Sequence, residues 1–233
     1  MLSTILFGLS VLGMSLHLLG EDETRRPTQV TSTERVNFGP GGLIRLETSS
    51  ENLTVDAWDR PEVEVTTVRS SWNAARCQGS VRLVTERRSP AELTVSAVRS
   101  SVSWSPRLWN RCGITIEEQV HVPRDSRLVI HHRAGYVSVN RVSGDIEVTS
   151  RSGDIVLMLP DPGLYSIDAQ SKVGGVSSDF AGTTRRTRLV GDEFTAGDAP
   201  SSRRIYLRMG LGDIAIKNVP PEPVAPITAN ISN

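Results

Sequence analysis

Hydrophobic and polar residues alternate along most of the chain beyond residue 35. Leu43–Glu47, Leu53–Ala57 and Leu93–Val98 are clear examples, and the 3.6-residue period of an amphipathic helix is almost absent. A period of two places successive side chains on opposite faces of a β-strand. Glycine, proline, asparagine or aspartate separates the segments every roughly 8–12 residues, which is typical of β-sandwiches, barrels and solenoids. The pattern therefore predicts an all-β protein.

A repeat in the second half refines this prediction. Glycine recurs every nine residues at Gly135, Gly144 and Gly153, and the tripeptide Gly-Asp-Ile stands at 144–146, 153–155 and 212–214. Each unit combines a turn with a short alternating strand, which must stack on its neighbours to bury its apolar face. We therefore predict a short β-solenoid, or a solenoid-like β-sandwich, of stacked Gly-Asp-Ile strand repeats with a strand-rich N-terminal half.

The Gly-Asp pairs are predicted to form the turns of these units. Glycine adopts a positive φ without strain, and an aspartate side chain accepts hydrogen bonds from the backbone of a turn. Calcium binding is the alternative, because carboxylate and carbonyl oxygens bind Ca²⁺, but calcium solenoids carry additional glycines in each nonapeptide. The predicted turn residues are Gly144, Asp145, Gly153, Asp154, Gly212 and Asp213.

The first 20 residues contain no formally charged side chain and are mostly apolar, whereas an acidic stretch follows at 21–23. This pattern indicates a secretory signal peptide or an uncleaved membrane anchor, and hence export to the periplasm or the cell surface. The predicted organisation is signal or anchor at 1–20, linker at 21–34, β-repeat domain at 35–218 and proline-rich flexible tail at 219–233. Within the domain, residues 190–202 are predicted to form an exposed loop.

Composition limits the classes of partner. The chain carries 26 Lys and Arg against 26 Asp and Glu, and this balance argues against nucleic-acid binding.

Cys77 and Cys112 are the only cysteines, and an even number in an exported chain makes them a candidate disulfide, with two unpaired thiols as the alternative. Trp104 and Trp109 lie in a loop-like stretch and form a candidate interaction surface.

The sequence contains no familiar catalytic motif. G-x-S-x-G, S-x-x-K and H-E-x-x-H are all missing from the chain. Glu117 and Glu118 are adjacent on a predicted strand, and so are His131 and His132, so each pair points to opposite faces. We predict no catalytic residue, no metal site and no cofactor.

Two segments resemble a known family. Ser-Gly-Asp-Ile recurs at 143–146 and 152–155 after Val122-Pro123, and Ile205–Lys217 closes with a related motif. These features resemble the DUF4097 family, bacterial β-strand repeat proteins proposed to be adhesins, over about residues 120–217. The resemblance implies an exported, envelope-facing β-repeat domain with no established enzymatic activity.

The expected function is therefore that of a non-enzymatic scaffold or adhesin-like interaction module of the cell envelope. Its partner would be an unidentified protein or glycan of the envelope, with membrane contact only through residues 1–20 if they remain attached. A carbohydrate-active β-helix enzyme is one alternative, and it requires Asp, Glu, Arg or Lys to gather on one concave face. A membrane-anchored envelope sensor or regulatory partner is the other.

Overall fold

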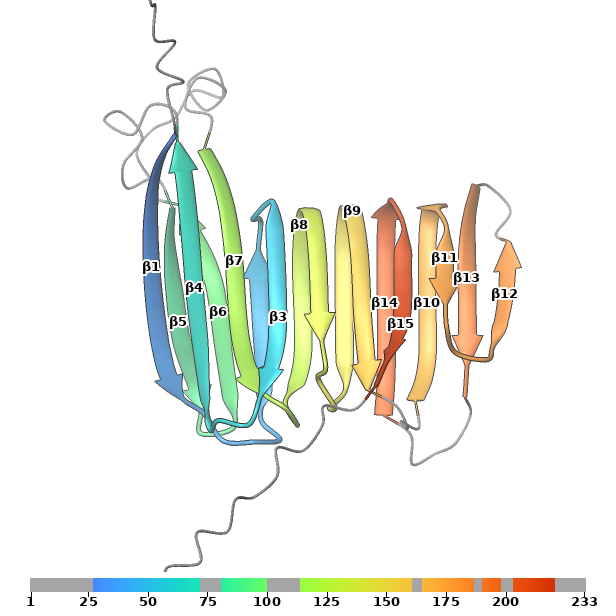
Figure 1. The fold of residues 1–233 in the computed structure, drawn as a ribbon, viewed down its shortest axis with the longest axis horizontal. Coiled ribbons are helices and arrows are strands. Elements are labelled where there is room, and N and C mark those ends of the chain that lie inside the picture. The colour runs from blue at the N-terminus through green and yellow to red at the C-terminus, as the bar shows by residue number, and fades with distance from the viewer. Residues whose placement is uncertain are drawn as a thin grey trace, which may run out of the picture.

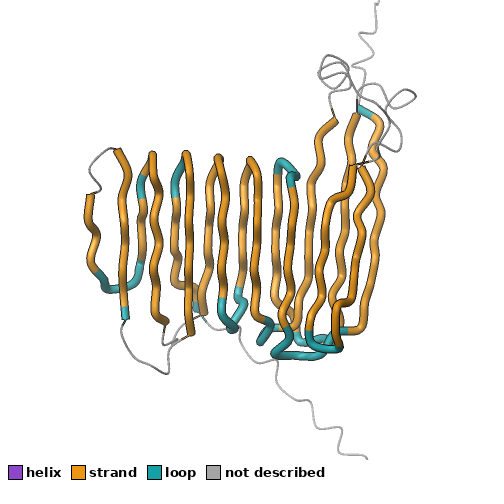
Figure 2. Tube along the Cα trace, turned by 180° about the vertical axis from the view of Figure 1, so that it is seen from behind, coloured by secondary structure: helices purple, strands orange, loops and turns teal. Residues whose placement is uncertain are grey.

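The computed structural model describes residues 27–71, 81–99, 114–160, 165–186, 190–197 and 203–220, and every regular element in these ranges is a β-strand (Figures 1 and 2). The described segments contain no helix that could span a membrane. Their 15 strands form one large mixed sheet whose two ends do not meet. The predicted all-β fold class is confirmed.

The strands follow one another along the chain with short connections. Their bounds are β1 Thr28–Asn37, β2 Leu43–Thr48, β3 Asn52–Trp58, β4 Glu62–Ser71, β5 Val81–Ser89, β6 Glu92–Arg99, β7 Ile114–Pro123, β8 Arg127–Asn140, β9 Ile146–Pro160, β10 Tyr165–Gly174, β11 Val176–Ser178, β12 Thr183–Arg186, β13 Val190–Ala196, β14 Arg203–Leu211 and β15 Ile214–Val219.

The middle of the molecule is a stack of chain segments that each pass from one layer of the sheet to the other. We call each such segment a rung. We use the term corner for the place where a rung bends from one layer to the other. β8 and β9 make the passage as single long strands through Gly135 and Gly153. β2 with β3, β14 with β15, and β10 with β11 make it as pairs of strands. Neighbouring rungs pair in parallel.

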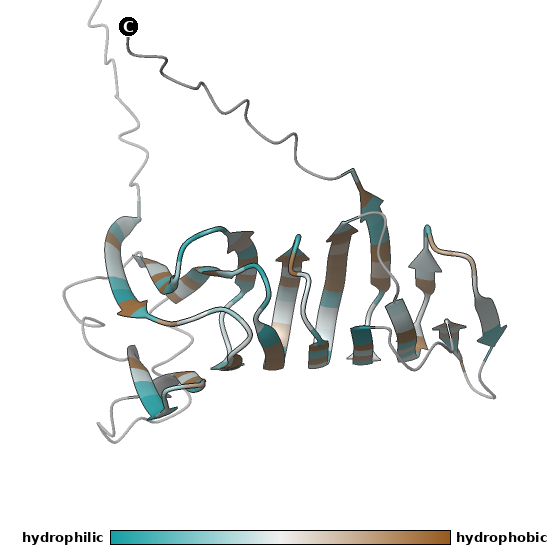
Figure 3. Ribbon diagram, turned by 90° about the horizontal axis from the view of Figure 1, so that it is seen from below, coloured by the Kyte–Doolittle hydropathy of each residue, from teal (hydrophilic) through white to brown (hydrophobic). Residues whose placement is uncertain are grey.

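The first halves of the rungs form layer A and the second halves form layer B, and Figure 3 shows both from below. Layer A has the order β5-β6-β2-β8-β9-β14-β10-β13-β12, and layer B has the order β1-β4-β7-β3-β8-β9-β15-β11. Antiparallel pairs lie toward both ends of the stack. Because β14 and β15 pair with β9, their rung lies between β9 and the β10–β11 rung. The fold is thus a solenoid-like sandwich whose rung order differs from the chain order.

Aliphatic side chains fill the space between the layers. In layer A, Leu128, Ile146, Ile205 and Ile167 are register partners on four successive strands and are at most 3% exposed. Stacking one such side chain per rung removes each from water, and a fully buried aliphatic side chain contributes roughly 1.5–3 kcal/mol. This row explains how a chain with few aromatic residues forms a continuous core.

The nine-residue repeat corresponds to half a rung. Gly144 precedes β9 at the end away from the corner, whereas Gly153 lies at the bend within β9. One Gly-Asp-Ile strand therefore lies in layer A, and the next lies in layer B. Two units together build one rung, which is how a short repeat produces a two-layered stack.

Two predicted boundaries were wrong. Strand β1 begins at Thr28, inside the predicted linker at 21–34, and pairs with β4 over ten register positions. Its side chains are largely exposed, so backbone pairing holds it in place without an alternating signal in the sequence. Strand β13 occupies residues 190–196 of the predicted loop and buries Phe194. Residues 1–20 and 221–233 lie outside the described ranges.

Candidate interaction surface

The corner of the stack is a ladder of glycines with positive φ. Gly135, Gly153, Gly212 and Gly174 have φ values of 122°, 110°, 132° and 137°. A Cβ atom on Gly153 would lie 2.0 Å from the carbonyl oxygen of Gly135, and one on Gly212 would lie 1.6 Å from that of Gly153. Neighbouring rungs therefore approach too closely at the corner to admit a side chain. Gly144 is crowded in the same way at the opposite end of its rung.

The aspartates of the Gly-Asp pairs join each rung to the next. Asp145 Oδ1 accepts a hydrogen bond from the backbone N–H of Arg204 at 2.9 Å, and Asp154 Oδ1 accepts one from Asp213 at 3.0 Å. Asp213 Oδ1 in turn accepts one from the N–H of Gly175 at 2.6 Å. These carboxylates thus satisfy backbone donors at the turns. Within the described ranges, no three His, Cys, Asp or Glu side chains gather as they would around a metal ion.

Replacement of Asp213 tests this role. Asp213→Ala removes the acceptor for the Gly175 N–H and is expected to lower the free energy of unfolding by about 1 kcal/mol. Asp213→Asn keeps an oxygen at the same place and is expected to retain most of that stability. Urea unfolding followed by circular dichroism measures both variants, and equal losses would contradict a hydrogen-bonding role.

Four of the residues predicted to carry function lie outside the described ranges. Cys77 falls in 72–80, and Trp104, Trp109 and Cys112 fall in 100–113. The disulfide and the tryptophan surface therefore remain predictions.

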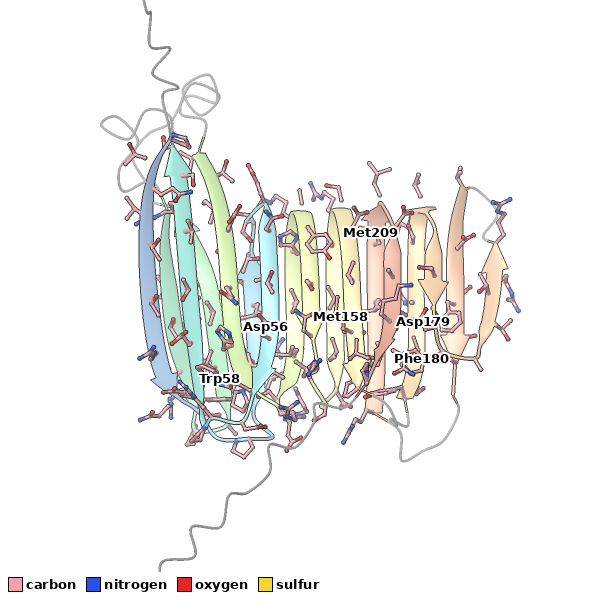
Figure 4. The ribbon with its side chains drawn as sticks, in the orientation of Figure 1. Asp56, Trp58, Met158, Asp179, Phe180 and Met209 are labelled. Carbon is pink, nitrogen blue, oxygen red and sulfur yellow. The ribbon has the colours of Figure 1, made fainter. Side chains whose placement is uncertain are left out.

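A hollow lies on the outer face of layer A beside the corner. It has a volume of about 360 Å³, and its lining includes Arg151, Lys172, Arg208 and Gly210. Three neighbouring strands, β9, β14 and β10, form the hollow, and their register partners there are Thr149, Arg208 and Gln170. Two residues further along the same strands come Arg151, Gly210 and Lys172. Gly210 therefore places no side chain between two exposed cations, and its backbone lies so close to β9 that a Cβ would be 2.3 Å from the carbonyl oxygen of Arg151. Met209, labelled in Figure 4, marks the adjacent part of β14.

Neighbouring groups orient Arg208 at this hollow. Its Nη1 and Nη2 donate to the two carboxylate oxygens of Asp168 at 3.0 and 2.7 Å, and its guanidinium lies 3.9 Å from the centre of the Tyr206 ring. Burial alone would lower the pKa of Arg208, but Asp168 and Tyr206 raise it above its usual value. Arg208 is therefore a fixed, permanently charged donor. By contrast, no ion pair within the described part of the chain engages Arg151 or Lys172.

A second hollow, of about 420 Å³, lies over layer B. It is lined by hydroxyl, amide and carboxylate side chains of β3, β4 and β7 and by Tyr136, which is 38% exposed. Asn52 lies in register between Tyr136 on β8 and Glu117 on β7, and its amide donates to Glu117 Oε1 at 3.5 Å. The described residues that line this hollow include no lysine or arginine, so the two hollows differ in charge.

A buried polar cluster lies between the layers near the same corner. Glu118 is 3% exposed and His132 is 5% exposed, although both are ionisable. Burial raises the pKa of Glu118 to about 7, while the nearby hydroxyls of Ser50 and Thr48 oppose that rise. Burial lowers the pKa of His132, whose Nε2 lies 2.9 Å from the carbonyl oxygen of Ser50. In the described part of the molecule, Glu118 Oε2 and His132 Nδ1 have no hydrogen-bond partner.

Sequence reasoning found neither the outer hollows nor this cluster as sites. The inward position of Glu118 could be predicted from the sequence, because Ile116, Glu118 and Val120 alternate with polar residues along β7. The hollow over Gly210 could not be predicted from the sequence, because Arg151 on β9 and Lys172 on β10 come to flank one strand only through the insertion of the β14–β15 rung between them.

A family model and several solved structures match the chain. Residues 135–217 match the model described as Toastrack DUF4097, which confirms the resemblance over this range. A proposed cell adhesion protein from Clostridium sporogenes has a similar fold, with a TM-score of 0.55 and 11% identity over 83% of this chain and 100% of that one. At this identity the likeness establishes the fold alone.

Two other structures match less closely. A proposed adhesin from Parabacteroides merdae gives a TM-score of 0.31 and 12% identity over 64% of this chain and 67% of that one. A proposed adhesin from Bacteroides fragilis gives a TM-score of 0.24 and 10% identity over 83% of this chain and 99% of that one. No curated protein matches the chain.

Proposed function

From the membership of residues 135–217 in the Toastrack DUF4097 family, we propose that the protein is an exported, non-enzymatic interaction module of the bacterial cell envelope. The observation that carries this proposal is the pair of outer faces, each hollowed near the corner and lined by polar or charged side chains. The fold shared with a proposed cell adhesion protein supports the same interpretation.

The architecture suits binding because it fixes side chains in rows. Parallel strands about 4.8 Å apart hold outward-facing residues of successive rungs at constant spacing. A ligand that lies across the strands therefore meets groups whose positions are set by backbone hydrogen bonds and a buried core. Such preorganisation lowers the entropic cost of binding.

Retention of envelope material tests the interaction role. The purified full chain, coupled to beads, is expected to retain envelope glycan or protein saturably and reversibly. The length of any bound glycan, followed by size-exclusion chromatography, is expected to stay unchanged during incubation. Progressive shortening would overturn the non-enzymatic role in favour of a carbohydrate-active enzyme, and a lack of any retention would overturn the interaction role itself.

Export is tested separately. Cells that express the full chain are fractionated, and the N-terminal peptide of the protein is identified by mass spectrometry. We expect the protein in the envelope or the medium, and recovery of the intact chain in the cytosol would contradict export. Retention of residues 1–20 on a membrane-bound chain would support the anchored sensor or regulatory alternative.

A further inference from the structure

We propose that the hollow over Gly210 binds the carboxylate or sulfate groups of an acidic polysaccharide. This inference rests on the proposed interaction function and names a ligand class for one of its faces. The hollow combines three cationic side chains, Arg151, Lys172 and Arg208, with the polar groups of Thr149 and Gln170. Hydrogen bonds between such cations and anionic oxygens are roughly twice as strong as neutral ones.

Arg208 supplies the fixed part of the site. Its guanidinium is held by Asp168 on β10 and stacked on Tyr206 of its own strand. Because these contacts restrict the side chain before a ligand arrives, little conformational entropy is lost when its remaining N–H groups bind an anion. Asp168 offsets part of the charge of Arg208, so the cationic excess of the hollow comes from Arg151 and Lys172.

The placement of Arg151 and Lys172 favours a polymer over a small anion. They stand on β9 and β10, which flank β14, so their backbones are separated by two strand spacings, or about 10 Å. Gly210, which lies between them, contributes no side chain to the hollow. A single anion in contact with both cations would have to draw these two long side chains together over Gly210, which costs side-chain conformational entropy. A chain with repeated negative charges can lie across the strands and contact both cations.

The surroundings disfavour an anionic membrane as the partner. The hollow lies on an outer face of the sandwich, whereas the corner beside it exposes the carboxylates of Asp154 and Asp213. A bilayer pressed against the corner would meet these negative charges and lose part of the attraction to the cations. A linear polysaccharide can follow the face without contacting the corner.

The test uses the full chain and two labelled acidic probes, oligogalacturonate for carboxylates and dextran sulfate for sulfates, with neutral dextran as the comparison. Fluorescence anisotropy measures the dissociation constants. Arg151→Glu/Lys172→Glu is expected to raise the Kd for at least one acidic probe by about tenfold or more. Binding of that probe is also expected to weaken as the salt concentration rises.

Arg127→Glu/Arg185→Glu is the matched control. It reverses the same number of exposed arginine or lysine charges on layer A strands β8 and β12, away from the hollow. We expect its Kd to change by less than about twofold, because a specific site depends on local contacts. Equal losses in both double variants would overturn a localised site, and so would failure of the wild type to bind either acidic probe.

Two further outcomes separate this inference from the function on which it rests. Binding of the wild type to vesicles that contain phosphatidylglycerol, without binding to either polysaccharide, would overturn the polysaccharide ligand and assign the hollow to lipid headgroups. Retention of envelope material by a protein that binds neither acidic probe would overturn the acidic ligand alone. Tight probe binding without retention of any envelope material would overturn the proposed function instead.

Discussion

Gly212→Ala is expected to lower the free energy of unfolding by more than about 3 kcal/mol, a large fraction of the roughly 5–15 kcal/mol that stabilises an ordinary folded protein. The added Cβ would lie 1.6 Å from the carbonyl oxygen of Gly153, in the adjacent rung. The φ of 132° is also a conformation that L-residues with a side chain rarely adopt. Relief would require either a change of this φ or separation of two paired rungs, and both disrupt the corner.

Gly39→Ala is the control for this effect. A Cβ on Gly39 meets no atom within 4 Å, and its backbone does not require a positive φ. The same substitution there is expected to change stability by less than about 1 kcal/mol, and to raise it if anything by restricting the unfolded chain. Urea unfolding monitored by circular dichroism compares the two variants. Similar midpoints for Gly212→Ala, Gly39→Ala and the wild type would contradict the steric role of the corner glycines.

The sequence predicted much of this fold because strand alternation and turn chemistry are local. The segments at 43–47, 53–57 and 93–98 lie within β2, β3 and β6. Their alternation correctly predicts the buried aliphatic residues Ile44, Leu46, Leu53, Val55, Leu93 and Val95. The recurring glycines marked the turns, since only glycine fits where backbones of adjacent rungs nearly touch. Each of these signals lies within a few residues of the structure it specifies.

The remaining features depend on contacts between distant segments. Strand β1 has almost no buried side chain and is held by pairing with β4, so its own residues carry little signal. The position of β14 and β15 between β9 and β10 follows from pairing across the chain, which no local pattern records. The cationic hollow depends on that placement, and a search for sequence motifs therefore could not assemble it.

Titration of the buried Glu118 carboxyl is expected to make the stability of the protein depend on pH. Its folded-state pKa of about 7 lies above the ordinary value of 4.5, because burial disfavours the charged carboxylate. Between these two pH values the folded state binds more protons than the unfolded state, so stability falls as the pH rises from about 4.5 and levels off above about 7. The full contribution is about 3 kcal/mol, since each unit of pKa corresponds to about 1.4 kcal/mol.

Glu118→Gln removes this titration and is expected to flatten the decline. At pH 8 the variant is expected to be about 1–2 kcal/mol more stable than the wild type, because a buried neutral amide costs less than a buried carboxylate but still lacks a full set of hydrogen bonds. Near pH 4.5 the advantage disappears, since the wild-type carboxyl is then protonated in the folded state. Chemical unfolding at a series of pH values measures the difference between the two proteins.

The neighbouring His132 also makes stability depend on pH, so the effect of Glu118 is obtained from the difference in stability between the variant and the wild type. Burial lowers its pKa below the ordinary 6.5, so protonation of the unfolded chain removes stability as the pH falls below that value. This effect opposes that of Glu118 in the wild type, and it is present in both proteins of the comparison. Glu117→Gln is the matched control, because Glu117 stands on the exposed face of the same strand. If Glu118→Gln and Glu117→Gln both gave stability curves parallel to that of the wild type, Glu118 would not carry the alkaline loss of stability, and the carboxylate would have to be solvated in the folded protein.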